Sequence, residues 1–217
     1  ITSFVTGNCG LSAIGFEKDT PHTGRIGGGL FGYWGQTTGV YPDAQSLFEA
    51  VSQNVPCNIA VLAGHCSARA SVAGGENRKL TPEEEQRMLD ILEENLKQGA
   101  AGISLGLMYS PGLYADEEEL KKVAALCVKY DRPLTVHPRA ESKVSMAYPQ
   151  LLGRSHLLRA LDELERIAKG TNLKLQYSHF IFVGRNTFAD KPKAMAIIQR
   201  MRREGVQVQF DIYHETK

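Results

Sequence analysis

Short apolar runs alternate with amphipathic helical segments along most of this 217-residue chain, and this alternation constrains its fold more than any other feature. Strands that are joined through helices run parallel, in a sheet that the helices cover. We expect strands at residues 1–5, 59–63, 102–107, 133–137, 173–179 and 206–213. We expect helices at residues 42–53, 82–98, 116–129, 155–169 and 192–204. The pattern therefore predicts a single α/β domain over residues 1–217.

The helix at residues 82–98 has the clearest start and stop signals. Thr81 is typical of an N-cap, Pro82 of the first helical position, and Glu84 completes a capping box with Thr81. Gly99 then ends the helical pattern. We therefore expect this helix to be well defined at both ends.

Two α/β architectures fit the alternation: an open, doubly wound sheet and a (β/α)8 barrel. Polar side chains decide between them, because they fall at or near the ends of different expected strands. They are Cys9, His65, His137, His179 and Asp211. Barrel enzymes carry their chemistry on the carboxyl ends of many strands, whereas an open sheet concentrates it at one switch point. Because a closed barrel needs two more strands, we predict a partial TIM-type (β/α) barrel of about six parallel strands with outer helices.

The composition is that of a soluble protein, with 42% hydrophobic and 23% charged residues and a formal net charge of +1. A near-neutral charge gives no electrostatic reason to expect nucleic acid or an anionic membrane as a partner. No apolar run approaches the roughly 20 residues that a membrane-spanning helix needs. The four cysteines are scattered without CxxC spacing, which argues against a zinc ribbon and favours a reducing compartment. We expect a cytoplasmic protein.

A long irregular segment rich in glycine and aromatic residues follows the first expected strand, at about residues 11–41. Segments of this length in compact domains are usually functional or flexible. Gly27, Gly29 and Gly32 match the GxGxxG spacing, but no strand leads into them and no helix starts there. We interpret the segment as a flexible loop, and a phosphate-binding role for it is a third and weaker hypothesis.

One thiol and two imidazoles share a place at the carboxyl end of a strand-like run: Cys9, His137 and His179. A thiolate and two imidazoles are ligands that Zn²⁺ selects. Three protein ligands leave the fourth position to water, as in a catalytic site. The alternative is a buried structural thiol and two hydrogen-bonded core histidines. For His65 we favour a structural hydrogen bond, because neighbouring strand residues such as His65 and Cys66 face opposite sides.

Five stretches of the chain carry a family resemblance. They read GNCG at residues 7–10, GHCSAR at 64–69, GAAGISLGLMYSPGLYA at 99–115, HPRAES at 137–142 and SH at 178–179. With these motifs the chain resembles the N-acyl-D-amino-acid deacylase (D-aminoacylase) branch of the amidohydrolase superfamily over nearly its whole length. The stretch at residues 99–115 is the most specific part.

The resemblance implies metal-dependent hydrolysis of an amide bond, namely deacylation of N-acyl-D-amino acids with one or two zinc ions as cofactor. It implies that Cys9 is a metal ligand able to bridge two metals, and that His137 and His179 are metal ligands. The family's HxH pair and general-base aspartate have no counterpart here, so the chain resembles strands two to seven of a longer barrel and is expected to be inactive alone. Ile181 stands where the family usually has a substrate-contacting lysine, and residues 213–215 replace its Tyr-Pro-Tyr. The preferred acyl group and amino acid therefore stay open.

Tyr109 and Arg139 are the candidate substrate contacts. Tyr109 follows a strand end and either contacts substrate or packs at the rim of the barrel. Arg139 lies two residues after His137, and it either binds a substrate carboxylate or forms a salt bridge with Glu141 or Asp211.

A second hypothesis is that the chain is a non-catalytic domain. Without the HxH pair and the aspartate it would bind metal weakly, and an incomplete barrel leaves two sheet edges unpaired. Such edges pair readily with another copy of the same chain. This hypothesis predicts a homo-oligomer, whereas the first predicts a small N-acyl amino acid as the partner.

Overall fold

The computed structural model describes residues 2–17, 19–22, 41–52, 55–149 and 153–212 of the chain. The glycines at positions 27, 29 and 32 and the tripeptide at 213–215 lie outside the described residues.

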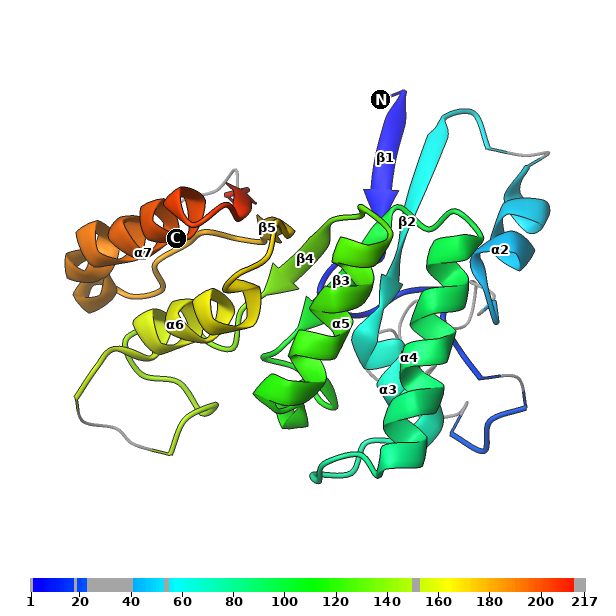
Figure 1. Ribbon diagram of the computed structural model, residues 1–217, viewed down its shortest axis with the longest axis horizontal. Helices are drawn as coiled ribbons and strands as arrows, with labels where there is room; N and C mark the ends of the chain where they lie inside the picture. The colour runs from blue at the N-terminus through cyan, green and yellow to red at the C-terminus, as the bar shows by residue number, and fades with distance from the viewer. Residues whose placement is uncertain (1, 18, 23–40, 53–54, 150–152, 213–217) are drawn as a thin grey trace.

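In the described residues six parallel strands form the sheet, and their order in space is their order in the chain. They are β1 (Ser3–Thr6), β2 (Asn58–Gly64), β3 (Gly102–Gly106), β4 (Leu134–His137), β5 (Lys174–Tyr177) and β6 (Gln207–Phe210). A doubly wound sheet reverses its strand order at a switch point, whereas a (β/α) barrel adds each strand beside the previous one. The sheet curls as a half-barrel (Figure 1), and the predicted partial TIM-type architecture is confirmed.

Helices connect the strands and pack along the sheet (Figure 1). They are α2 (Ala44–Val51), α3 (His65–Ala73), α4 (Pro82–Lys97), α5 (Glu117–Lys129), α6 (His156–Ala168) and α7 (Lys191–Arg203), with short 3-10 turns η1 (Gly112–Tyr114) and η2 (Arg185–Asp190). Consecutive helices from α3 to α7 contact one another. None of the helices in the described ranges is long and apolar enough to cross a membrane.

The capping box at the start of α4 forms as expected. The Thr81 hydroxyl accepts a hydrogen bond from the Glu84 backbone N–H (3.2 Å), and the Glu84 carboxylate accepts one from the Thr81 N–H (2.9 Å). These two bonds satisfy backbone donors that the first helical turn leaves without partners. Local sequence therefore fixes where this helix begins.

Helix α3 was not expected from the sequence. All of its residues except Ala70 are buried, so it lacks the apolar stripe and polar face by which surface helices are recognised. The expectation that His65 and Cys66 lie on a strand and face opposite sides is therefore wrong. Both lie in the first turn of α3, directly after β2.

The centre of the sheet is more deeply buried than its edges. Every residue of β3 and β4 is buried, whereas every residue of β1 is exposed and only Val208 of β6 is buried. Packing rigidity is greatest where side chains are fully enclosed. The carboxyl ends of β3 and β4 are therefore a firm base for a site.

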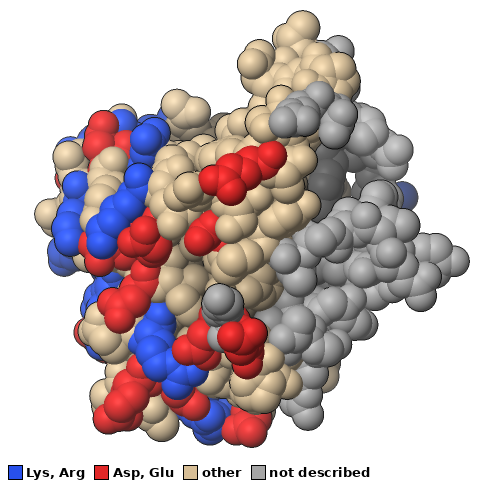
Figure 2. Space-filling view, turned by 90° about the vertical axis from the view of Figure 1, so that its right-hand side faces the viewer, with Lys and Arg blue, Asp and Glu red and all other residues tan. Residues whose placement is uncertain are grey.

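Ion pairs join α4 to α5, α5 to α6 and α6 to α7. They link Lys122 to Glu85, Lys129 to Glu93, Arg166 to Glu117 and Arg200 to Glu165. Acidic and basic side chains are interleaved over the left-hand part of the face shown in Figure 2. Exposed pairs of this kind contribute about 0–1 kcal/mol each, so apolar packing must supply most of the stability of the helical layer.

Candidate metal centre

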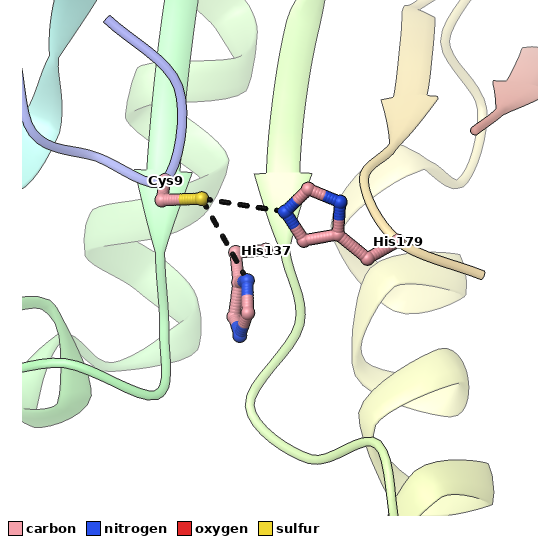
Figure 3. A group of neighbouring side chains, drawn as sticks. All are labelled: Cys9, His137 and His179. Atoms are coloured by element: carbon pink, nitrogen blue, oxygen red, sulfur yellow. Dashed lines mark hydrogen bonds between the residues drawn. The ribbon is translucent and has the colours of Figure 1, made fainter. Parts of the chain in front are cut away.

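The structure brings Cys9, His137 and His179 together at the carboxyl ends of the strands (Figure 3). The Cys9 Sγ lies 3.7 Å from His137 Nδ1 and 3.6 Å from His179 Nε2. All three candidate ligand atoms lie within 4.8 Å of one another. The residues are more than 120 positions apart in sequence from Cys9 to the histidines, so only the fold makes this cluster.

These distances suit a tetrahedral metal ion. Bond lengths of about 2.3 Å to sulfur and about 2.0–2.1 Å to nitrogen, at the tetrahedral angle, separate the two ligand atoms by about 3.5 Å. The two measured sulfur–nitrogen distances are close to that value. The sulfur is therefore already spaced from both imidazole nitrogens as it would be around a zinc-sized ion.

Carboxylates face the ring nitrogens that point away from the cluster. The Asp211 Oδ1 accepts hydrogen bonds from the His179 backbone N–H (2.9 Å) and from Nδ1 of its ring (3.0 Å), and Gln176 Nε2 donates to Asp211 Oδ2 (2.9 Å). With Nδ1 carrying the proton, the lone pair of Nε2 is directed at Cys9. Histidine ligands of metals commonly have such a carboxylate partner.

The second histidine has a looser partner of the same kind. His137 Nε2 lies 3.8 Å from Glu141 Oε1, and both atoms are buried without a hydrogen bond in the described residues. Burial raises the pKa of Glu141 to about 7. Burial is also the main cause that lowers the pKa of His137 to about 4, and the electrostatic effect of the neighbouring His179 is the second cause.

The thiol is also held in its neutral form by its surroundings. Burial, followed by the negative charges of Glu141 and Asp211, raises the pKa of Cys9 to about 11. A bound cation favours the thiolate and reverses this preference, because a coordinating thiol is deprotonated. A neutral imidazole and a thiol next to carboxylates thus form a donor set that suits a divalent metal.

Two of the three residues adopt backbone conformations that are unusual for side-chain-bearing residues. Cys9 has φ 59° and His179 has φ 62°, both in the left-handed region. Such residues are uncommon outside glycine and gather at functional sites. The conformations turn both side chains off the ends of their strands and toward His137.

Comparisons with known proteins find relatives along nearly the whole chain. No protein-family model matches the chain. The N-acyl-D-glutamate deacylase and the D-aminoacylase of Alcaligenes xylosoxydans xylosoxydans are each 28% identical to it, over 98% and 96% of the chain. The crystal structure of an N-acyl-D-glutamate deacylase from Bordetella bronchiseptica, in complex with zinc and a phosphonate inhibitor, superposes over 99% of the chain with a TM-score of 0.80 and 29% identity.

The chain is homologous to the N-acyl-D-amino-acid deacylases. The resemblance that the sequence motifs carry is thereby confirmed. The chain spans about 40% of the length of these curated deacylases and 42% of the solved chain.

Tyr109 lies beside the cluster of this deacylase-like chain. Its ring is tilted against the His137 ring, with 4.8 Å between the ring centroids. The side chain therefore reaches the rim of the candidate metal centre. Whether it contacts substrate stays a prediction.

The guanidinium of Arg139 is hydrogen-bonded to other protein groups. Its Nε and Nη2 donate to the Glu163 carboxylate at 3.0–3.2 Å, and its Nη1 and Nη2 donate to the carbonyls of Leu113 and Ala115. A salt bridge was one expectation for this residue, but the partner is Glu163 of α6 and neither Glu141 nor Asp211. A substrate carboxylate would have to displace these buried contacts.

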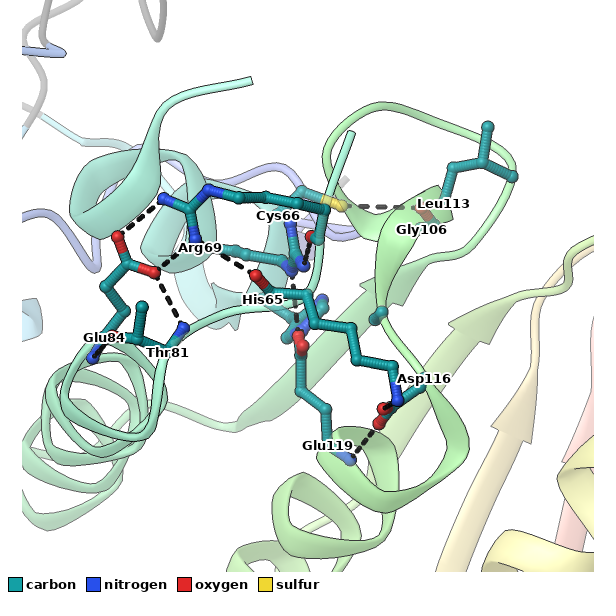
Figure 4. Close-up of polar contacts among 12 residues, drawn as sticks. His65, Cys66, Arg69, Thr81, Glu84, Gly106, Leu113, Asp116 and Glu119 are labelled. Atoms are coloured by element: carbon teal, nitrogen blue, oxygen red, sulfur yellow. Dashed lines mark hydrogen bonds and ion pairs between the residues drawn. The ribbon is translucent and has the colours of Figure 1, made fainter. Parts of the chain in front are cut away.

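His65 has the structural hydrogen bond that was favoured for it. Its Nε2 lies 2.7 Å from Glu119 Oε1 of α5, and Arg69 Nε donates to the same oxygen at 3.0 Å (Figure 4). All three side chains are buried. They join α3 to α5 and leave His65 outside the metal cluster.

Sequence reasoning missed several residues that shape the site. Glu141 was expected only as a possible salt-bridge partner of Arg139, and Glu163 and Ser104 were not singled out. Ser104 is fully buried and hydrogen-bonded to the loop that carries Cys9. The only local signal for it was a hydroxyl inside the otherwise apolar run of β3.

Proposed function

We propose that the protein carrying this chain is a zinc-dependent amidohydrolase that deacylates N-acyl-D-amino acids. The observation that carries the proposal is the convergence of Cys9, His137 and His179 at distances that suit zinc, in a chain homologous to deacylases along nearly its whole length. One or two zinc ions fit the proposal, and Cys9, His137 and His179 would hold them.

The residues of this chain hold and orient the metal in the proposed site. Cys9, His137 and His179 supply the ligand atoms, and Asp211 fixes the His179 ring so that Nε2 points into the cluster. Zinc bound there supplies a water of lowered pKa and polarises the amide carbonyl. Tyr109, beside the His137 ring, is the proposed substrate contact on this side of the site.

The relatives support the choice of substrate class. Those that match are named for deacylation of N-acyl-D-glutamate and for D-aminoacylase activity, and the solved one holds zinc. We propose the same class for this protein without a choice of acyl group or side chain. The four free cysteines support the cytoplasm, a reducing compartment, as its location.

The test compares wild-type protein with two cysteine variants. Cys9→Ala should lose zinc, measured by metal mass spectrometry, together with hydrolysis of N-acetyl-D-amino acids. Cys57→Ala is the matched control, because Cys57 is also a half-buried free thiol but lies directly before β2, at the opposite end of that strand from the cluster. It should keep both properties. Deacylase activity that survives Cys9→Ala undiminished would contradict the proposal.

A further inference from the structure

The loop that carries Cys9 must extend across several strand ends before the thiol can reach the histidines. Cys9 follows β1, whereas His137 ends β4, three strands along the sheet. Neighbouring strands are about 4.8 Å apart, so the loop must cross the ends of β2 and β3. Something must hold it there if the thiol is to meet the imidazoles.

Ser104 of β3 makes hydrogen bonds on both sides of Cys9. Its hydroxyl accepts a hydrogen bond from the Gly10 backbone N–H (3.1 Å) and donates one to the Gly7 carbonyl. Ser104 is fully buried. These two bonds use the one donor and one of the two acceptor positions of the hydroxyl, and they satisfy two backbone groups of the same turn.

The turn is also seated closely on β3. A side chain at Gly106 would overlap the Cys9 carbonyl oxygen, and one at Gly10 would lie 2.5 Å from the Gly106 nitrogen. Gly106 is in register with His137 of the neighbouring strand β4. Ser104 therefore ties the Cys9 turn to the strand that borders His137.

The left-handed conformation of Cys9 needs such a tie. A residue with a Cβ atom adopts positive φ only when its surroundings hold it there. The Ser104 hydroxyl bonds the residues at positions 7 and 10, which enclose Asn8 and Cys9. Loss of the hydroxyl would free the turn at both ends.

We propose that Ser104 is a positioning residue for the metal centre, whose hydroxyl sets the Cys9 sulfur at its distance from His137 and His179 before the metal binds. The inference rests on the proposed function, because it assigns a role toward zinc. Ser104 does not touch the metal cluster itself and acts through the backbone of the Cys9 turn.

A second buried serine provides a matched control. The Ser67 hydroxyl of α3 accepts a hydrogen bond from the Ser12 N–H (2.9 Å) and donates one to the Ser12 carbonyl (3.3 Å). Ser67 is as buried as Ser104 and makes the same pair of bonds to the same loop, but three residues beyond Cys9. Both serine-to-alanine changes remove one buried hydroxyl, and only one of them removes it from the Cys9 turn.

The experiment measures the zinc Kd of the intact protein by competition with a chromophoric chelator. Outer residues that orient metal ligands typically change metal affinity about 10–100-fold when they are mutated. We expect Ser104→Ala to weaken zinc binding by about tenfold or more and Ser67→Ala by no more than about twofold. Cobalt-loaded Ser104→Ala should also show a weaker or shifted thiolate-to-cobalt charge-transfer band. Unchanged affinity in Ser104→Ala, or an equal loss in Ser67→Ala, overturns the proposal.

Hydrogen exchange of the Gly10 amide separates this proposal from the proposed function. In metal-free protein the Gly10 amide should be protected, and Ser104→Ala should remove that protection. If the wild-type protein binds no zinc, the proposed function fails, and the exchange still decides the part played by the hydroxyl. A Gly10 amide that exchanges freely in the wild type overturns the positioning role even if Ser104→Ala does not fold.

Discussion

Cys9 and His179 reach the candidate metal centre through single-residue turns in the left-handed region, so the site depends on a few backbone conformations. Each turn has its own support. Asp211 accepts hydrogen bonds from the His179 backbone and ring. The Cys9 turn packs on β3, where Ser104 is hydrogen-bonded to it and Gly106 leaves room for the Cys9 carbonyl. Small changes in these supports should therefore move ligand atoms without unfolding the barrel.

Gly106→Ala tests this directly. The added Cβ would overlap the Cys9 carbonyl oxygen, so the turn must shift and carry the sulfur away from the histidines. We expect a clear loss of zinc affinity and a loss of about 1–3 kcal/mol in the free energy of unfolding, as overpacking commonly causes. Zinc competition and urea unfolding measure the two effects.

Gly102→Ala is the control for that change. Gly102 lies in the same strand and is equally crowded, against the Pro133 carbonyl, but at the end of β3 far from the site. It should destabilise the protein to a similar extent and leave the zinc affinity of the folded protein unchanged. Equal losses of zinc affinity in the two variants would mean that general strain, and not the Cys9 turn, is responsible.

The candidate ligands could be found from sequence, and their supports could not. Cys9, His137 and His179 stand out because each follows a strand-like run, and parallel strands bring such positions to one edge. Ser104 gave no comparable signal, since its hydrogen-bond partner Gly10 lies 94 positions away. Only the assembled sheet brings a particular buried hydroxyl into contact with a particular loop.

Among the elements, α3 and α5 are joined by a buried polar contact. One carboxylate oxygen of Glu119 on α5 is hydrogen-bonded to both His65 Nε2 and Arg69 Nε. Burial raises the pKa of Glu119, but the His65 hydrogen bond and the charges of His65 and Arg69 outweigh burial and hold it below the ordinary value. The contact also fixes the start of α3, where Ser67 N–H donates to the Gly10 carbonyl (3.1 Å).

Glu119→Gln should therefore destabilise the protein by about 3–5 kcal/mol at pH 7, because it leaves a buried arginine without its counter-charge. A lowered carboxyl pKa gives stability that is present above the ordinary value of about 4.3 and is lost as the pH falls through the folded-state pKa. The difference between variant and wild type should shrink below about pH 4. Urea unfolding as a function of pH measures it.

Glu118→Gln is the neighbouring control. The Glu118 side chain is 74% exposed and pairs with Lys121 at 2.9 Å. Exposed pairs contribute about 0–1 kcal/mol, so this variant should stay close to the wild type at every pH. A loss for Glu119→Gln no greater than that for Glu118→Gln would show that the buried contact contributes little.

The elements differ in how well sequence predicts them. Strands and the amphipathic helices α4 to α7 were expected to within a few residues, because the strands are short apolar runs and each helix shows one buried face; α4 and α5 also have side-chain N-caps. Helix α3 was missed because it is enclosed on nearly all sides and thus has no polar face. Residues that are buried all round lose the periodicity on which such predictions depend.

The sheet as a whole is an arc with exposed edge strands. In the described part of the chain, β1 pairs with β2 alone and β6 with β5 alone. Phe4 and Val5 of β1 are 41% and 57% exposed, and Phe210 of β6 is 37% exposed. Apolar side chains on an unpaired edge strand favour pairing with another chain.

The 217-residue chain expressed on its own should therefore self-associate through β1. Val5→Lys places a charge on that edge and should reduce association, because lysine is a common protection of edge strands. Val144→Lys is the control, since Val144 is 49% exposed but lies in a loop after β4. Light scattering over a range of concentrations measures the mass. A chain that is monomeric throughout would contradict edge pairing and would remove the support for a self-associating, non-catalytic role. The other outcome is that Val5→Lys weakens association, Val144→Lys does not, and the chain still binds zinc through Cys9. Edge pairing and the metal site would then be independent properties of one sheet.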